Sequence, residues 1–273
     1  MKPLNTQHAN VGIIVQARYD SSRFPGKGAQ IIWDNETTIA FLLKRLLRLN
    51  KVLGQKLILA TTNTPDCDCF ESICSDIGVH CFRGPKENVF SRFEQCASEF
   101  SLDVIVRITG DCVLHCPDLI QSSINKWKAI HAFARNEFII TNKSPFSYCD
   151  GFDIEIFPRE LICKYSSIIH DDSRLQEHVT SYFYCNPDII KVNILNNNPS
   201  HFTSVRLVLD YPADLEALRK IVISYAESFS EKTPIEGLSY GELTRLELFR
   251  RWLASPALAP NYQYLERNST LCV

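Results

Sequence analysis

The chain is organised around Val11-Gly-Ile-Ile-Val15 and the loop that follows it, Gln16-Ala-Arg-Tyr-Asp-Ser-Ser-Arg-Phe-Pro-Gly-Lys-Gly28. The apolar run is typical of a buried strand, and the loop carries Arg18, Arg23 and Lys27 between small residues. Guanidinium groups bind phosphate oxygens in pairs, lysine adds a point charge, and glycines let backbone N–H groups approach a ligand. The loop therefore predicts a polyphosphate site. A solvated surface turn is the alternative, because basic residues often occupy such loops.

The length and composition indicate a globular chain. With 273 residues, of which 45% are hydrophobic, the sequence suffices for one large core or for a core with a small lobe. The 29 lysines and arginines nearly balance the 31 aspartates and glutamates, so the overall charge favours neither nucleic acid nor an anionic membrane. The first ten residues lack the apolar core of a secretory signal, and no apolar run has the length of a membrane span. We therefore expect a cytoplasmic protein without nucleic-acid or membrane partners.

Eleven cysteines raise the question of disulfides or a metal site. Their odd number, their irregular spacing and the lack of an export signal favour reduced thiols. The densest group comprises Cys67, Cys69, Cys74 and Cys81 with His80, but it contains no C-x-x-C pair and crosses a predicted helix and strand. Buried apolar thiols therefore explain this group better than a zinc site, which is the alternative.

Apolar runs rich in β-forming residues alternate with amphipathic segments in the first half of the chain. The expected strands are Val11–Val15, Lys56–Ala60, Val79–Phe82, Val104–Ile108 and Phe138–Thr141, and the expected helices are Thr37–Leu49, Asp66–Ile77, Glu87–Phe100 and Pro117–Ile130. Such alternation predicts parallel strands with right-handed crossovers, hence an α/β sheet covered by helices on both faces. Ligands of these sheets bind beyond the carboxyl ends of the strands, where the basic loop lies.

The pattern becomes mixed after Thr141 and favours antiparallel strands beside the parallel core. The expected elements are a strand Phe152–Phe157, a helix from about Pro158, a helical Glu177–Tyr184, strands Ile189–Leu195 and Val205–Leu209, and a helix from Pro212. A polar linker after about Ser228 precedes an amphipathic helix, Tyr240–Leu253, whose apolar stripe docks on the core or on a second subunit. The sequence leaves both arrangements open, and the second would make a homodimer.

Two aspartates follow predicted strands and are candidates for metal binding. Asp111 ends Arg107-Ile-Thr-Gly-Asp111, so we expect it at the same sheet edge as the basic loop. A carboxylate that faces phosphates needs a cation between them, and Mg²⁺ binds one or two carboxylates together with phosphate and water oxygens. A plain Gly-Asp turn is the alternative for this residue. Asp210 lies just before a helix in which Pro212 suits the first position, so Tyr211 is the expected cap and Asp210 is left for metal binding.

A third polar group suits a polyhydroxylated ligand. Asp150, Asp153 and Glu155 lie close together, and the last two alternate along a predicted strand, so they share one face. His178 follows Glu177 and precedes an apolar-patterned segment, which makes it the best placed of the seven histidines to act as a base. We expect these five residues to contact an acceptor. A solvated strand face and a structural histidine are the alternatives.

Together these motifs resemble the nucleotide-binding signature of cytidylyltransferases that activate acidic sugars, and above all the SpsF-like spore-coat polysaccharide branch. This family includes CMP-Kdo synthetase and CMP-sialic acid synthetase. The resemblance begins with Ala17-Arg18-x-x-Ser21-x-Arg23-x-Pro25-Gly26-Lys27. Later matches are Phe82-Arg83-Gly84, Val89-Phe90-Ser91-Arg92, Val106-Arg-Ile-Thr-Gly-Asp-Cys112, Asp150-Gly-x-Asp-x-Glu155, Glu177-His-Val-Thr180, Leu209-Asp-x-Pro-x-Asp-Leu-Glu216, Ser255-Pro-Ala-Leu and Glu266-Arg-Asn268. They span nearly the whole chain, and their order is far more specific than any single motif.

The resemblance implies a Rossmann-like nucleotide-diphospho-sugar transferase fold of the GT-A-like type, a mostly parallel sandwich with an antiparallel extension. Residues 1–228 would form the nucleotidyltransferase domain, with the nucleotide-binding half at about 10–141 and the acceptor-binding part at about 142–228. Residues 229–273 would be a C-terminal helix and tail that pack on the core or on a second subunit.

The resemblance also implies CTP as co-substrate and Mg²⁺ as cofactor, with the metal held by Asp111 and Asp210. The residues implied to bind the nucleotide are Ala17, Arg18, Ser21, Arg23, Lys27, Arg83, Arg92 and Thr109. The residues implied to act in catalysis are Arg18, Lys27, Asp111 and Asp210.

Three positions depart from the family pattern. Asp20 replaces a small residue and adds negative charge to the phosphate loop, Asn88 replaces an aspartate, and Val113-Leu-His115 replaces Pro-Leu-Ile. We expect transfer of CMP from CTP to an acidic sugar or sugar phosphate, with release of pyrophosphate, for the synthesis of surface polysaccharide or glycoconjugate. The alternatives are a metal-dependent glycosyltransferase that consumes a nucleotide sugar and a non-catalytic protein that binds a nucleotide or sugar.

Overall fold

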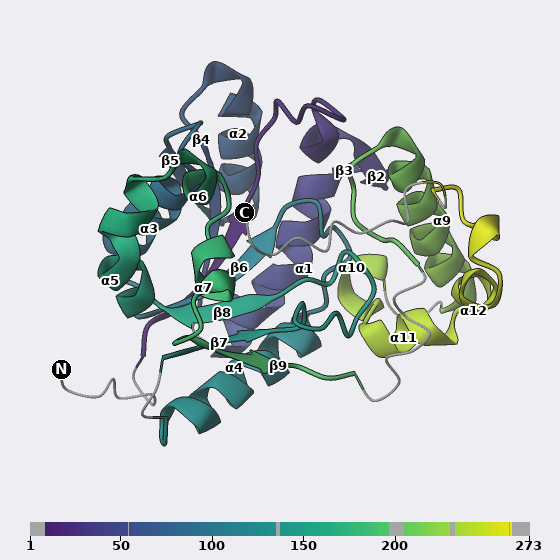
Figure 1. The fold of residues 1–273 in the computed structure, drawn as a ribbon. Helices are drawn as coiled ribbons and strands as arrows, with labels where there is room; N and C mark the ends of the chain where they lie inside the picture. The colour runs from purple at the N-terminus through teal and green to yellow at the C-terminus, as the bar shows by residue number, and fades with distance from the viewer. Residues whose placement is uncertain are drawn as a thin grey trace.

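One seven-stranded sheet forms the centre of the molecule in the computed structural model, which describes residues 9–53, 55–134, 137–196, 205–229, 233–261 and 263. The strand order is β5-β4-β1-β6-β8-β7-β9 (Figure 1). The strands are β1 Val11–Gln16, β4 Lys56–Thr62, β5 His80–Gly84, β6 Val104–Thr109, β7 Phe138–Thr141, β8 Glu155–Pro158 and β9 Ile190–Asn193. A separate two-stranded sheet pairs β2 (Ile31–Trp33) with β3 (Glu36–Thr37).

The sheet is parallel in its first half and mixed in its second. β1 lies parallel between β4 and β6, and β4 is parallel to β5. β8 runs antiparallel to β6 and to β7, and β7 is parallel to β9. The predicted mostly parallel α/β sheet with an antiparallel extension is therefore confirmed. Because Gln16 and Thr109 are paired at the ends of β1 and β6, the loops after these strands leave from one edge of the sheet.

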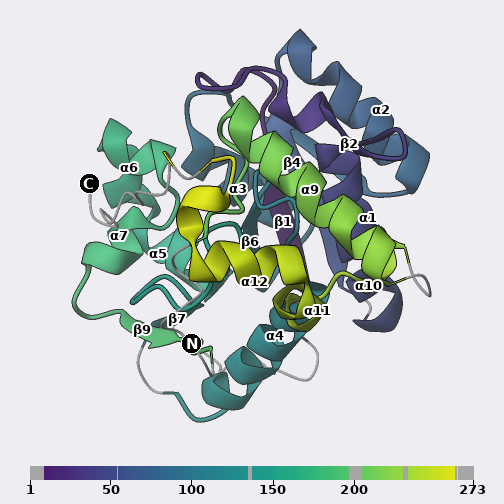
Figure 2. The same ribbon diagram turned by 90° about the vertical axis from the view of Figure 1, so that its right-hand side faces the viewer.

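Helices cover both faces of this sheet, as Figures 1 and 2 show from two directions. The longer helices are α1 Thr38–Leu53, α2 Asp68–Ile77, α3 Val89–Glu99, α4 Pro117–His131, α5 Arg159–His170 and α9 Pro212–Ser228. The shorter ones are α6 Ser173–Glu177, α7 Ser181–Cys185, α10 Pro234–Gly237, α11 Tyr240–Arg245 and α12 Glu247–Ala254, with single 3₁₀ turns at Lys27–Ala29, Pro65–Cys67 and Pro256–Leu258. α1, α2, α4, α9, α11 and α12 pack on one face, and α3, α5, α6 and α7 pack on the other.

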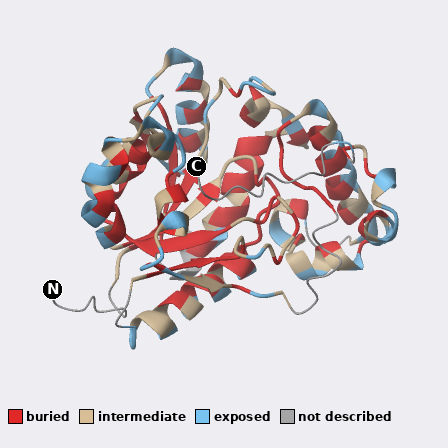
Figure 3. Cartoon of the chain, viewed as in Figure 1, coloured by how far each residue is buried: buried red, intermediate tan, exposed pale blue. Residues whose placement is uncertain are grey.

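The side chains of β1 explain why its sequence is apolar throughout. Ile13 and Val15 point into the core beneath α1, whereas Ile14 points into the core beneath α3. A strand with helices on both sides needs apolar residues on both of its faces, so the alternation of polar and apolar residues disappears. Figure 3 shows the same division, with buried residues along the strands and exposed residues on the outer sides of the helices.

Three predicted elements differ in the second half of the chain. Val205–Leu209 is not a strand, because only Arg206 forms a bridge, with Asp150, and Leu209 donates its backbone N–H to the Asp111 carbonyl. The predicted strand Phe152–Phe157 begins only at Glu155. The predicted helical Glu177–Tyr184 is divided between the end of α6 and α7, with residues 178–180 between them in neither helix.

The predicted helix Tyr240–Leu253 is also divided. Leu246 has an extended backbone, with φ −64° and ψ 127°, and separates α11 from α12. Its side chain is buried together with Leu243, Phe249 and Trp252 in the core on the α9 side of the sheet. The apolar stripe therefore reaches the core of its own chain, and the break at Leu246 lets both short helices follow that surface. In the part of the chain that the structure describes, no helix combines the length and the hydropathy needed to cross a membrane.

Candidate active site

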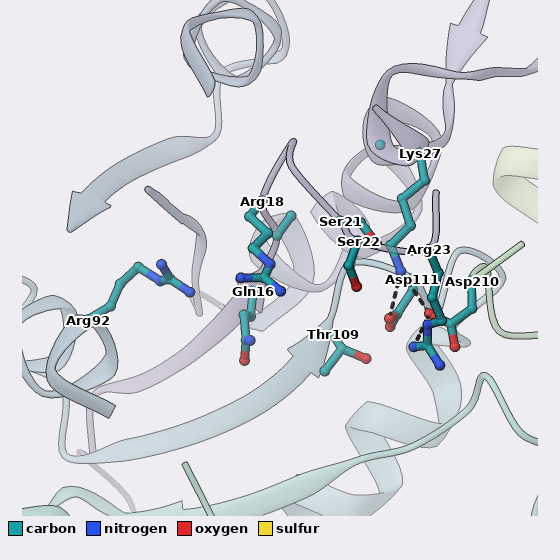
Figure 4. Close-up of a pocket in the computed structure, with 13 residues that line it drawn as sticks. Gln16, Arg18, Ser21, Ser22, Arg23, Lys27, Arg92, Thr109, Asp111 and Asp210 are labelled. Atoms are coloured by element: carbon teal, nitrogen blue, oxygen red, sulfur yellow. Dashed lines mark hydrogen bonds and ion pairs between the residues drawn. The ribbon is translucent and has the colours of Figure 1, made fainter. Parts of the chain in front are cut away.

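A cavity of about 180 Å³ lies where β1 and β6 end. Figure 4 shows Arg23, Lys27, Asp111 and Asp210 gathered on one side of it and Arg92 on the other, with Gln16, Arg18 and Thr109 between them. The residues that line it are Gln16, Ala17, Arg18, Ser21, Ser22, Arg23, Lys27, Gly28, Arg92, Thr109, Gly110, Asp111 and Asp210. The structure thus brings the predicted basic loop and the two predicted aspartates to one cavity, at the sheet edge expected from the sequence.

Glycines allow the loop after β1 to turn back towards the sheet. Gly26 has a φ of +70°, which favours glycine, and it donates its backbone N–H to the Tyr19 carbonyl at 2.7 Å. The turn that follows, Lys27–Ala29, directs the Lys27 side chain to the cavity (Figure 4). Across the cavity Gly110 lies so close to β1 that a Cβ atom would stand 3.0 Å from the Gln16 carbonyl oxygen. The close approach of the two strand ends therefore depends on a residue without a side chain.

The Lys27 ammonium group joins the two aspartates. Its Nζ donates to Asp111 Oδ2 at 3.1 Å, to Asp210 Oδ1 at 3.0 Å and to the Leu209 carbonyl at 2.7 Å. Burial alone would lower the pKa of Lys27, but the two carboxylates outweigh it, and the net pKa is raised. Burial likewise favours a raised pKa for Asp111, yet the charge of Lys27 outweighs it and the pKa is lowered. Lys27 and Asp111 are therefore held in their charged forms. Arg23 adds a second cation on Asp210 Oδ1, at 2.8 Å.

The donor set fits a hard divalent cation that shares its shell with a phosphate. Asp111 and Asp210 approach the same ammonium group, so their oxygens lie close to one another, and Asp111 Oδ1 is buried without a hydrogen-bond partner. Two carboxylates with phosphate and water oxygens match the coordination that Mg²⁺ takes. Among the described residues no group of three or more His, Cys, Asp or Glu side chains could hold a metal by itself. The ten cysteines that the structure describes, including Cys67, Cys69, Cys74 and Cys81, form no disulfides.

Arg92 faces the cavity as a buried cation with few hydrogen-bond partners. Its side chain is fully buried, Nη1 donates to the Pro85 carbonyl at 2.9 Å, and Nε has no hydrogen-bond partner. Burial, together with the nearby charge of Arg18, lowers the pKa of Arg92 to about 10. Two guanidinium groups that repel each other beside a cavity favour an anion between them.

A second, larger cleft of about 640 Å³ continues from this cavity. It shares Gln16, Arg18, Arg23, Arg92 and Asp111 with the first, and its further lining residues are Lys86, Glu87, Val89, Arg107, Ser173, Arg174, Gln176, Glu177 and His178. The predicted acceptor residues Glu177 and His178 therefore lie on the same continuous surface as the basic loop. The sequence-based site missed Lys86, Arg107 and Arg174. Of these, Arg107 had a signal in the sequence, since it lies four residues before Asp111.

The other three predicted acceptor residues have partners within the fold. Asp150 receives Arg206 Nη1 at 2.9 Å, and Asp153 lies 3.9 Å from Lys143 Nζ. Glu155 is 2% exposed, since it lies opposite Arg107 in the pairing of β6 with β8 and binds its guanidinium group. The structure does not place these three among the residues that line the two cavities.

Arg83 and Asn88, one of the unusual positions, also have partners in the fold. The Arg83 guanidinium binds Asp68 at 2.6 Å and Glu71 at 2.8 Å, and Arg83 lines neither cavity. Asn88 caps α3 by accepting the Ser91 backbone N–H at 2.8 Å.

Asp20 brings its negative charge into the loop together with a counter-ion. Lys86 Nζ lies 2.5 Å from Asp20 Oδ2, and Arg18 Nε lies 3.9 Å from Oδ1. The hydrogen bond to Lys86 keeps the pKa of Asp20 below its usual range. The charge that Asp20 adds is therefore offset within the loop region itself.

This chain is similar in sequence and structure to known proteins. The Cytidylyltransferase family model matches residues 12–144. An uncharacterised protein of Methanocaldococcus jannaschii is 30% identical over 206 residues, which cover 74% of this chain and 79% of that protein. The spore coat polysaccharide biosynthesis protein SpsF of Bacillus subtilis is 28% identical over 214 residues, which cover 76% of this chain and 84% of SpsF. The solved structure of a cytidylyltransferase from Leptospira borgpetersenii superposes with a TM-score of 0.77 and 28% identity, over 93% of this chain and 98% of that one.

Proposed function

We propose that this chain, which belongs to the cytidylyltransferase family and is a nucleotidyltransferase, transfers CMP from CTP to an acidic sugar or a sugar phosphate and releases pyrophosphate. The single observation that supports this most strongly is the meeting of the basic loop with Asp111 and Asp210 in one cavity. Cations for a triphosphate and carboxylates for its metal are the parts that this reaction needs.

In the proposed reaction an oxygen of the acceptor attacks the α-phosphorus of CTP. The new bond joins that oxygen to phosphorus, the bond from phosphorus to the β-phosphate oxygen breaks, and pyrophosphate leaves with the electron pair. The protein has little covalent chemistry to do, so catalysis depends on position and charge. Arg18, Arg23 and Lys27 would bind the departing pyrophosphate, where negative charge accumulates. Arg92, with Thr109 and Ser21, would bind other parts of the nucleotide.

Asp111 and Asp210 are proposed to hold Mg²⁺ against the phosphates. When bound, a divalent cation would offset charge on the α-phosphate and favour attack by the acceptor oxygen. Lysine has three N–H donors, and Asp111, Asp210 and the Leu209 carbonyl accept all three of them from Lys27. Binding of the triphosphate would therefore require Lys27 to exchange at least one of these acceptors for a phosphate oxygen.

The larger cleft is the proposed acceptor site. Lys86, Arg107 and Arg174 bring N–H donors to it. Each already pairs with a carboxylate of the fold, so an acidic acceptor would have to share these donors with Asp20, Glu155 and Asp172. His178 beside Glu177 would accept the acceptor proton. Contact of Asp150, Asp153 and Glu155 with the acceptor stays a prediction. The name of the Bacillus subtilis relative supports a place in surface polysaccharide synthesis. The cytoplasmic location, the homodimer and the division at residue 228 also stay predictions.

Nucleotide binding and pyrophosphate release test this function together. We expect CTP with Mg²⁺ to raise the melting temperature more than UTP, ATP or GTP, and a panel of acidic sugars and sugar phosphates to yield pyrophosphate from CTP. Asp111→Asn should lower turnover on the order of 10²–10³-fold, the usual cost of losing one charge-stabilising contact. Asp76→Asn, an exposed position on α2, is the matched control. Stabilisation by a nucleotide sugar in place of CTP, or parental turnover in Asp111→Asn, would contradict the proposal.

A further inference from the structure

Behind the cavity, a buried polar network holds the second carboxylate oxygen of Asp210. Arg206 Nη2 donates to Asp210 Oδ2 at 2.6 Å, while Lys27 and Arg23 occupy Oδ1 on the cavity side. The other nitrogens of Arg206 bind Asp150 Oδ2 at 2.9 Å and Asp214 Oδ1 at 3.2 Å. The guanidinium group is planar and rigid, so it fixes three carboxylates relative to one another.

Asp214 in turn fixes the backbone that carries Asp210. Its side chain is completely buried, and its Oδ2 accepts the backbone N–H groups of Asp210 and Tyr211, both at 2.8 Å. Asp214 lies in the first turn of α9, where a carboxylate also favours the helix N-terminus. One carboxylate thus holds both the main chain at Asp210 and the arginine that orients its side chain.

Asn261 closes the network from the C-terminal segment. Its Nδ2 donates to Asp214 Oδ1 at 2.7 Å and to the Arg206 carbonyl at 2.9 Å, and the residue is 1% exposed. The segment before Asn261 comprises α12 and the turn Pro256–Leu258, and Trp252 of α12 anchors it in the core. A segment far along the chain therefore reaches the groups that set the orientation of Asp210.

We propose that Arg206 and Asn261 are positioning residues that hold Asp210 Oδ1 towards the cavity for a divalent cation. This inference rests on the proposed function, because it takes Asp210 as a metal ligand. A carboxylate whose far oxygen is tied cannot turn away from the cavity, so less ordering remains for the cation to impose. Groups that orient a metal ligand without touching the metal typically contribute about 10–100-fold in metal affinity.

Two substitutions in the full chain test this role. Arg206→Lys keeps the positive charge but loses the planar guanidinium group that binds three carboxylates. Asn261→Ala removes only the hydrogen bonds from Asn261 to Asp214 and to the Arg206 carbonyl. Asn10→Ala is the matched control, since Asn10 Nδ2 likewise donates two hydrogen bonds, to the carbonyls of Phe100 and Ser101, next to the opposite end of β1. The measurement is the calorimetric dissociation constant of Mn²⁺ in the presence of α,β-methylene-CTP, with the melting temperature of each variant.

We expect the dissociation constant of Mn²⁺ to rise about 10–100-fold in Arg206→Lys and in Asn261→Ala, and to stay at the parental value in Asn10→Ala. High metal concentration should restore most of the turnover, because the chemistry itself is intact. Parental Mn²⁺ affinity in a folded Asn261→Ala would overturn the inference, even if Arg206→Lys fails to fold.

Asp210→Asn distinguishes a failure of the positioning role from a failure of the proposed metal site. If Asp210→Asn loses Mn²⁺ affinity while both positioning variants keep it, Asp210 is a metal ligand and only the positioning role is wrong. If Asp210→Asn itself keeps parental affinity, the metal site of the proposed function is wrong and the inference falls with it.

Discussion

Lys27 is the residue on which the charge balance of the cavity depends. Its ammonium group lies within 3.1 Å of Asp111 and 3.0 Å of Asp210, and only Asp210 has a further cation, Arg23, from the basic loop. A buried carboxylate without a cation is costly, because burial disfavours its charged form. Removal of Lys27 should therefore leave Asp111 in need of another positive charge.

Lys27→Met should make the stability of the protein depend on metal. A cation that binds the folded state alone stabilises it more, the further its concentration exceeds its dissociation constant, so millimolar Mg²⁺ should raise the melting temperature of the variant more than that of the parent. Turnover of CTP should fall on the order of 10²–10³-fold, because the pyrophosphate loses a contact. Differential scanning calorimetry with and without Mg²⁺ measures the first effect. The matched control is Lys44→Met, which breaks the pair between Lys44 on α1 and Glu36 on β3 and should respond to Mg²⁺ like the parent. Equal responses of Lys27→Met and the parent would contradict this account.

At the scale of elements, the antiparallel pairing of β6 with β8 explains the position of Glu155. The register places it opposite Arg107, which binds Glu155 Oε2 and donates to Gln16 Oε1 at 3.2 Å. Thr180, just before α7, donates to Oε1 at 2.7 Å. Glu155 therefore ties β8 and α7 to an arginine that lines the larger cleft. Its sequence pattern predicted a residue facing the acceptor, and that role stays a prediction.

Glu155 should make the free energy of unfolding depend on pH in the acidic range. Burial would raise its pKa, but Lys143, Arg107 and the Thr180 hydrogen bond outweigh burial and lower it from 4.5 to about 2. Because the pKa is lower in the folded state, the stabilisation is complete above about pH 4.5 and is lost as the pH falls through about 2. The lowered pKa corresponds to about 3 kcal/mol at neutral pH.

The free energy of unfolding in urea tests this at pH 7 and pH 3. Glu155→Gln should be less stable than the parent by about 3 kcal/mol at pH 7, and the difference should shrink by more than half at pH 3. Glu160→Gln, an exposed position on α5, should show no such change between the two conditions. The same difference at both pH values would mean that the charge of Glu155 does not stabilise the fold.

For the whole molecule, the sequence predicted the elements whose structure depends on nearby residues. β1, β4 and β6 were predicted because a strand covered on both sides is continuously apolar. Their ends then brought Lys27 and Asp111 to one edge, since parallel strands finish together. The segment Val205–Leu209 was mistaken for a strand because it is equally apolar. Its backbone instead bonds to the loops at Asp111 and Asp150, which no local pattern predicts.

Contacts between distant segments account for what the sequence did not predict. Arg206 meets Asp150 through the bridge between their backbones, and it meets Asn261 because the C-terminal segment returns to the site. Hydropathy does not predict such contacts. Arg92 was predicted from its motif, but its burial without an ion pair to any described residue depends on how α3 packs. The chemistry of the site was thus more predictable than the network that supports it.

The central claim is that the basic loop and the two aspartates converge on one divalent cation and the triphosphate of CTP. Crystals grown with CTP and Mn²⁺ and measured at the manganese absorption edge test it most directly. The account predicts an anomalous peak within roughly 2.0–2.6 Å of carboxylate oxygens of both Asp111 and Asp210, with the triphosphate against Arg18, Arg23 and Lys27. A peak elsewhere, or a triphosphate bound away from that loop, would contradict it.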